Sequence, residues 1–525
     1  MEALVELALK RLAQAFDQLD ALPLLPFSEA MLILRFCVGV RANYLMDQLP
    51  TEAQRLVAAK WDPAVERCLT RMFMGQHPSP RVFLFGPGGL GVARQAQQGD
   101  LSRVCGWARA AAVVEEYLPK QKRQVQLTAD SKHPVHAEVR AAYARLPEEA
   151  RKKRGAGADA YNPLNVYESP RAAAAAAAAG VAGATGTGAG AGAATRATPC
   201  TTTTSRTKSR SSSSATPLFN PLKAAVDVLC KAVHKAQRVE VFDSLTGVGR
   251  QLFELAGAKG ARAWADATPR FKYHKMASTH SRVAHSLWLG MPIAELEGRA
   301  DPTGRSLLRA QPPALRHSAV LQAYLDAALF CGGAVYKEVP HLFCPWATSR
   351  VDPKLRTAEL GEQRRMDLVL VAHLSGILAD PTVVDGASQG DVDARGTNEK
   401  AERAVTAAEE EKRAYYGPDL PAGFDFYPAA HDTLSGCGKG ALALQRRLAV
   451  MAAQHANNGA PPSQHLIDLK AKDVLQRVSV AVMRACADSV CKQFAKSPHV
   501  ALTPAHRYGW TARATPPRGE NGSAF

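Results

Sequence analysis

The sequence predicts an α+β protein with a mostly helical N-terminal half, a low-complexity linker and a C-terminal α/β domain that holds a small mixed sheet. Apolar residues recur at helical spacing through roughly the first 75 positions. Residues 172–216 consist mainly of Ala, Gly, Ser and Thr, a composition that buries too little apolar surface to offset the entropy of ordering. Residues 364–386 carry two short apolar runs around a Ser-Gly turn, a pattern typical of a hairpin.

Composition shifts along the chain divide it into segments. We expect a helical region (1–158), a disordered low-complexity linker (159–219), a second helical region (220–310), an α/β domain (311–455) and a helical extension with a loose tail (456–525).

The N-terminal region begins with a helix that ends before Pro23. Farther on, the strand-like run RVFLF leads into the glycine cluster Gly86–Gly91 (GPGGLG). Glycines permit a close backbone approach to a phosphate, but no GK[ST] follows and Pro87 interrupts the pattern. The cluster therefore predicts a structural turn.

Net charge, cysteine pattern and hydropathy indicate the kind of partner and the cellular compartment. The formal net charge is +17, which favours a polyanion, with nucleic acid ahead of an anionic membrane. The ten cysteines include no CxxC pair, so we expect reduced thiols in an intracellular protein. No apolar run approaches the roughly 20 residues that span a bilayer, and the charged first helix is unlike a signal peptide.

Acidic residues mark the strands of the predicted α/β domain. Asp367 and Asp380 lie on the two arms of the hairpin, Glu338 ends the preceding strand, and Lys412 lies on the following helix. Paired carboxylates are ligands that Mg²⁺ prefers, and a lysine can neutralise charge on a phosphate. This order predicts a metal-dependent phosphodiesterase core. The alternative is that the acids are ordinary strand-end residues and that Lys412 belongs to a solvated helix face, following Glu409–Glu411.

The order of short motifs resembles the C-terminal portion of non-LTR retrotransposon polyproteins, downstream of the reverse transcriptase. That region carries a restriction-like endonuclease of the PD-(D/E)xK type. The matching motifs are Arg316-His317-Ser318, Glu338-Val339-Pro340, Arg365-Met366-Asp367, Asp380-Pro381-Thr382-Val383-Val384, Lys412-Arg413-Ala414-Tyr415-Tyr416 and PAAHDTLSG over Pro428–Gly436. The N-terminal segments LILRFCVGVRANYLMDQLP and GGLGVARQAQQGD resemble the stretch after the polymerase thumb.

The resemblance implies a restriction-endonuclease-like fold for residues 311–455 and assigns roles to individual positions. It makes Asp367, Asp380, Lys412 and Glu338 catalytic, with Mg²⁺ or Mn²⁺ on Asp367 and Asp380. It also implies nucleic-acid contacts by Arg316, His317, Arg365, Arg413 and Tyr416. His431, in the last motif, is expected in a loop.

Several positions depart from the family pattern. Ser306 and Ala310 stand where a His and a Cys of a zinc knuckle are usual, so we expect no zinc. Pro381 removes a backbone donor inside a strand. The chain has no Asp-Asp pair, and therefore no polymerase Tyr-x-Asp-Asp box.

Three functions remain open from the sequence. The first is a retrotransposon-derived DNA endonuclease. The second is a non-catalytic nucleic-acid-binding protein, with DNA or RNA as partner and a decayed nuclease fold. The third is a helical interaction scaffold. The first two place the protein in the nucleus and need no membrane.

Overall fold

The computed structural model describes residues 1–117, 134–148, 221–339, 366–372, 375–386, 402–417, 420–421 and 423–495. The predicted linker (159–219), Arg365 and the tail beyond residue 495 lie outside these residues. The chain forms two compact units, each assembled from separate segments. Unit 1 comprises Met1–Gln18, Cys37–Ala64 and Ala93–Asp243, and unit 2 comprises Leu19–Phe36, Val65–Val92 and Ser244–Phe525.

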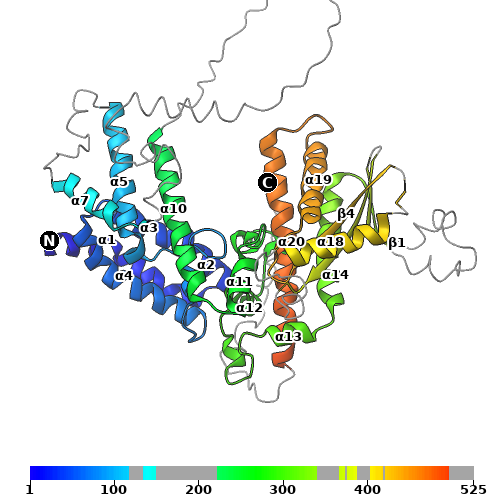
Figure 1. Cartoon of the computed structure of the whole chain (residues 1–525), viewed down its shortest axis with the longest axis horizontal. Coiled ribbons are helices and arrows are strands. Elements are labelled where there is room, and N and C mark those ends of the chain that lie inside the picture. The colour runs from blue at the N-terminus through cyan, green and yellow to red at the C-terminus, as the bar shows by residue number, and fades with distance from the viewer. Residues whose placement is uncertain are drawn as a thin grey trace, which may run out of the picture. The chain divides into compact units, whose positions relative to one another are not determined.

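The described part of unit 1 is helical, as the sequence predicts. The helices that lie wholly or mainly in this unit are α1 (Glu2–Ala21), α3 (Gly39–Met46), α4 (Thr51–Met72), α5 (Gln95–Tyr117), α7 (Pro134–Arg145) and α10 (Pro221–Ser244) (Figure 1). Apolar side chains of α5, α7 and α10, among them Val104, Val139 and Val233, form one buried cluster. An ion pair of 2.7 Å between Arg103 and Glu138 joins α5 to α7 beside this cluster.

Unit 2 contains both the remaining helices and the sheet. Its helices are α2 (Phe27–Ile33), α11 (Val248–Ala256), α12 (Ser278–Leu289), α13 (Arg305–Ala310), α14 (Pro313–Ala328), α18 (Arg403–Tyr416), α19 (Lys439–Ala456) and α20 (Gln464–Ala495). Shorter helical turns occur at Leu22–Leu24, Leu34–Val38, Pro80–Phe83, Ala263–Asp266, Lys272–His274, Ala294–Leu296 and Leu329–Cys331. Across the part of the chain that the structure describes, no helix is both long enough and apolar enough to cross a bilayer.

Helix α20 completes the core of unit 2. It packs against α12, α14 and α19, and its apolar side chains, such as Val478 and Met483, are buried. Trp264 and Trp288 are buried in the same unit with their rings in edge contact at 6.4 Å. Both tryptophans therefore serve packing.

The glycine cluster forms a turn, but the run before it is not the strand that we expect from sequence. Pro80–Phe83 is a 3₁₀ turn. Its backbone accepts hydrogen bonds from the chain that follows the glycine cluster, such as Val92 N to Val82 O at 3.1 Å. Gly86 and Gly88 have positive φ, which explains their residue type. The carbonyl of Gly88 accepts a hydrogen bond from Arg81 Nε at 3.2 Å. Arg262 likewise donates to the carbonyls of Gly86 and Leu90, so the turn serves as a structural acceptor of arginine hydrogen bonds.

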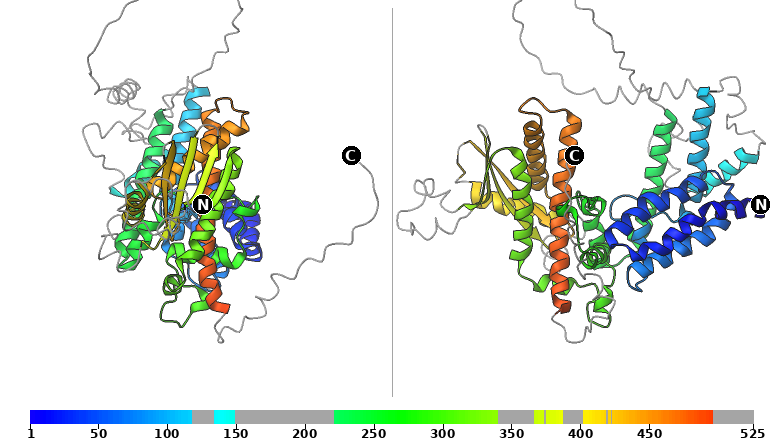
Figure 2. Two further views of the ribbon diagram at one scale, coloured as in Figure 1. Left: turned by 90° about the vertical axis from the view of Figure 1, so that its right-hand side faces the viewer. Right: turned by 180° about the vertical axis from the view of Figure 1, so that it is seen from behind.

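The sheet confirms the predicted small mixed sheet. Its strands are β1 (Ala334–Val339), β2 (Met366–Ala372), β3 (Ser375–Val384) and β4 (Phe424–Asp432), in the order β1-β2-β3-β4. The first two pairings are antiparallel and β3 pairs with β4 in parallel, so the predicted hairpin lies at the centre. The strands lie side by side in Figure 2. Helix α14 packs against β1, β2 and β3, while α18 packs against β3 and β4.

Candidate functional site

Three acidic residues lie in one row across the sheet. The β1–β2 pairs Lys337–Leu368 and Val339–Met366 lie on either side of Glu338 and Asp367. The pairing of β2 with β3, continued one residue beyond Leu368 and Ala379, places Asp367 opposite Asp380. Directly opposite residues of an antiparallel pair have their Cβ atoms about 5 Å apart. Strand pairing therefore brings together acids that are far apart in the sequence.

Lys412 of α18 completes this row at Asp380. Its Nζ donates to Asp380 Oδ2 at 2.6 Å, and the Asp380 side chain is only 2% exposed while that of Lys412 is 33% exposed. The other carboxylate oxygen, Oδ1, is buried without a well-aligned donor among the described residues, although the side chains of Asp367 and Tyr416 lie close to this carboxylate. A buried charged oxygen without a partner is costly, so Oδ1 is suited to a further cation or donor.

The environment of Asp367 opposes its negative charge. Burial is the main cause, and the Asp380 carboxylate adds to it, so that the pKa of Asp367 rises to about 8. Glu338 raises this pKa further, whereas Lys412 lowers it. A perturbed pKa in a pair of facing carboxylates is typical of functional sites, where a cation supplies the missing positive charge.

His317 approaches the same pair from α14. Its Nδ1 lies 2.9 Å from the carbonyl oxygen of Pro381 and its Nε2 lies 3.5 Å from Asp367 Oδ2. Because a carbonyl can only accept, Nδ1 carries the proton of that bond. The ladder between β2 and β3 ends at Ala379, and among the described strands only β4 pairs with β3 at Pro381. Pro381, which cannot donate a backbone hydrogen bond, therefore lies where the ladder to β2 has already ended.

Glu338 is more exposed than the two aspartates. Its backbone has a φ of 48°, in the left-handed region, and its side chain is 46% exposed. The carboxylate lies 3.4 Å from Lys337 Nζ. A non-glycine residue in this region stores strain, which is common at functional sites.

The residues predicted to contact nucleic acid lie in different environments. Arg413 is half exposed and lies 3.5 Å from Glu409. Tyr416 is buried with Met366 and Leu378, and burial followed by the charge of Asp380 raises the pKa of its phenol. Arg316 is buried and donates to the carbonyl of Leu308 at 2.7 Å, which ties α14 to α13. Of the predicted set, the structure thus brings His317 and Tyr416 to the carboxylates.

The donor set suits a hard divalent cation only in part. Carboxylate oxygens are the ligands of Mg²⁺ and Mn²⁺, and these ions keep several waters. Asp367 and Asp380 fit this chemistry, with Oδ1 of Asp380 unpartnered. Within the described residues, no cluster of three or more His, Cys, Asp or Glu side chains is arranged to hold a metal.

A further acidic residue, Asp385, anchors α13 and was not identified from the sequence. It lies just after β3 and pairs with Arg305 at 2.7 Å and with Arg309 at 2.9 Å, both from α13. Asp301 accepts from the backbone N–H groups of Thr303 and Ser306 at the start of the same segment. The spacing of four residues between the arginines, on one helix face, is the signal that indicates a shared acid.

The segment Asp432–Gly436, at the end of the PAAHDTLSG motif, closes β4 by local hydrogen bonds. Asp432 is buried, and its Oδ1 accepts from the N–H groups of Leu434 at 2.7 Å and Gly436 at 2.9 Å. His431 precedes it at the end of β4, which corrects our expectation of a loop. The loop expectation was wrong because alternation in PAAHDT is masked by proline and alanine, whereas the pairing with β3 extends through Asp432.

No known protein-family model matches this chain, and no curated protein is significantly similar to it in sequence.

Proposed function

We propose that unit 2 is a divalent-metal-dependent endonuclease that nicks DNA, and that the chain derives from the C-terminal portion of a non-LTR retrotransposon polyprotein. One observation carries this proposal. Asp367 and Asp380 face each other at the centre of the sheet, and Lys412 reaches Asp380 from α18. The order α14, β1, β2, β3, α18, β4 supports it, because the motifs that resemble the PD-(D/E)xK nuclease occur in that order. A DNA substrate also implies a nuclear protein.

Asp367 and Asp380 would hold the cation, Mg²⁺ or Mn²⁺, with Glu338 in support. When bound, the cation supplies an activated water and stabilises charge on the scissile phosphate. No zinc is needed for this chemistry. The like charges of the two aspartates, which oppose each other in the free site, are the reason why this pair favours a divalent ion.

Lys412 and His317 act on the substrate side of the carboxylates. Lys412 is one-third exposed, so its ammonium group is available to phosphate oxygens once a cation shares the charge of Asp380. The bond from His317 Nδ1 to Pro381 fixes the ring and leaves Nε2 beside Asp367. The net charge of +17 draws the DNA backbone to the protein by release of counterions.

Plasmid nicking is the direct test. Purified protein is incubated with supercoiled plasmid and Mg²⁺ or Mn²⁺, and open-circle product is measured over time. We expect Asp367→Ala and Asp380→Ala each to lower the nicking rate at least about 100-fold, because each removes a metal ligand. Lys412→Met should lower the rate while leaving DNA binding within about twofold, since one of many cations is lost.

Asp425→Ala is the matched control, because Asp425 is an exposed acid on β4 of the same sheet. It should nick at the wild-type rate, and circular dichroism should show that all four variants are folded. Nicking that persists in both Asp367→Ala and Asp380→Ala would sink the proposal, as would nicking that survives EDTA.

One observation favours a non-catalytic nucleic-acid-binding role instead. The Lys412–Asp380 pair neutralises itself at 2.6 Å, so the two groups form a stable structural pair without any cation. In that case the protein retains plasmid in a gel-shift assay, shows no metal-dependent nicking, and binds equally well after Asp367→Ala and Asp380→Ala.

A further inference from the structure

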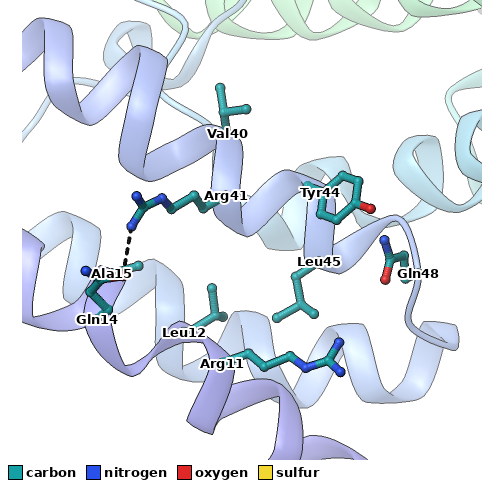
Figure 3. A pocket seen from close by; sticks show the side chains of 9 residues that line it. All are labelled: Arg11, Leu12, Gln14, Ala15, Val40, Arg41, Tyr44, Leu45 and Gln48. Carbon is teal, nitrogen blue, oxygen red and sulfur yellow. Dashed lines mark hydrogen bonds between the residues drawn. The ribbon is translucent and has the colours of Figure 1, made fainter.

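Unit 1 contains a pocket that the proposed nuclease does not use. It lies between α1 and α3 and has a volume of about 500 Å³, in the range of pockets that take a small organic ligand or one nucleotide. Its lining residues are Arg11, Leu12, Gln14, Ala15, Val40, Arg41, Tyr44, Leu45 and Gln48. Figure 3 shows the lining side chains, with those of Arg11 and Arg41 on either side of Leu12.

The charge of the pocket is one-sided. None of the lining residues is acidic, whereas two are arginines. Arg41 Nη1 donates to the side-chain oxygens of Gln14 and Gln18, each at 3.3 Å, so neutral groups orient its guanidinium, and among the described residues no acid pairs with it. Arginine forks are suited to phosphate oxygens.

The floor and rim of the pocket are apolar and aromatic. Leu12 and Leu45 are buried, and Tyr44 at the rim is 70% exposed. An exposed ring beside an apolar floor is a platform for a flat, partly apolar group such as a nucleobase. A duplex cannot use this platform, because its bases are already stacked inside.

We infer that this pocket binds single-stranded nucleic acid, with one base seated on Tyr44 and the flanking phosphates on Arg11 and Arg41. Two arginines, a free aromatic ring and an apolar floor together match a nucleotide in a single strand. The site is separate from the carboxylates of unit 2 and does not depend on the proposed nuclease function.

Fluorescence anisotropy of the full chain tests the site, with a fluorescein-labelled dT20 strand in EDTA, so that cleavage plays no part. Tyr44→Ala should weaken binding at least about fivefold, the loss expected for one stacked base. Tyr44→Phe should restore most of the affinity, because the ring remains. Arg41→Ala should weaken binding to a similar extent and reduce its salt dependence.

Arg55→Ala is the control, because Arg55 is an exposed arginine of the same unit that lies outside the pocket. It should change the affinity less than twofold, and a duplex of the same length should bind Tyr44→Ala and wild type alike. Equal losses for Tyr44→Ala and Arg55→Ala would overturn the inference. The inference would also be overturned if a poly-glutamate peptide displaced labelled dT20 at the concentration at which unlabelled dT20 does so. That result would assign the pocket to an acidic protein partner.

Discussion

His431 shows at the residue scale how burial sets the charge of a side chain. It is fully buried, with Tyr324 Oη 2.9 Å from its Nε2 and Cys437 Sγ 3.6 Å from its Nδ1. Gln445 donates to Tyr324 Oη at 3.1 Å, so the group forms a closed neutral network. Burial lowers the pKa of His431 to about 3, because a charged ring would lose its hydration there.

This lowered pKa predicts a pH dependence of stability. Below pH 6.5 His431 binds a proton in the unfolded chain but stays neutral in the folded chain. The contribution of the neutral ring to the free energy of unfolding is therefore complete above pH 6.5 and declines as the pH falls toward about 3. His431→Gln replaces the ring with a side chain that does not titrate. The difference in free energy of unfolding between wild type and His431→Gln should therefore shrink below pH 6.5, by at most about 1.4 kcal/mol per pH unit.

Urea unfolding at several pH values between 7.5 and 4.5 measures this difference. A constant difference for His431→Gln would mean that the ring titrates normally and is open to water.

The junction of α18 and α19 shows at the element scale how one acid can organise two helices. Glu409 of α18 is buried and accepts from the backbone N–H groups of Gly440, at 2.9 Å, and Ala441, at 3.2 Å. These donors are at the start of α19, where backbone N–H groups lack helical partners and favour a negative charge. Glu409 therefore replaces a local capping residue.

Two glycine substitutions separate the effect of close packing at this junction from the effect of helix propensity. A Cβ at Gly440 would overlap the carbonyl oxygen of Pro428, whereas a Cβ at Gly417, just after α18, would meet nothing within 4 Å. We expect Gly440→Ala to lower the free energy of unfolding by about 1–3 kcal/mol, the usual cost of overpacking. Gly417→Ala should be neutral or stabilise by less than about 1 kcal/mol. Chemical denaturation of both variants tests the contrast, and equal effects would show that α19 is not held at this distance from β4.

The net charge of +17 is a property of the whole molecule and predicts how it binds DNA. Each phosphate that the protein neutralises contributes about −0.9 to the slope of log K against log salt concentration. Contacts with three or more phosphates give a slope of about −2.7 or steeper. This is the expected dependence for both the nuclease and the non-catalytic proposal.

Anisotropy titrations of a 20-base-pair duplex in EDTA, between 50 and 300 mM KCl, measure this slope. A duplex of the same sequence with an uncharged methylphosphonate backbone should bind far more weakly and with little salt dependence. An affinity for the natural duplex that does not change with salt would rule out backbone neutralisation and leave the interaction-scaffold function.

Local patterns in the chain were enough to predict most elements of the fold. Apolar periodicity located the helices, and the two apolar runs around a Ser-Gly turn predicted β2 and β3 at the centre of a mixed sheet. These patterns work because helix and strand periodicity depend on neighbours within a few residues. The RVFLF run shows the limit of this reasoning, because Pro80–Phe83 forms a 3₁₀ turn although its backbone bonds to the returning chain.

The candidate site depended on contacts between distant segments. Glu409, Glu410 and Glu411 look alike in the sequence, yet only Glu409 is buried, since α18 turns that face toward the start of α19. Likewise, Arg316 and Tyr416 are buried, whereas Arg413 from the same motifs is half exposed. Sequence supplied the acids and the lysine, but strand register and helix packing set their separation, burial and pKa. These quantities depend on residues tens of positions apart, which local patterns do not encode.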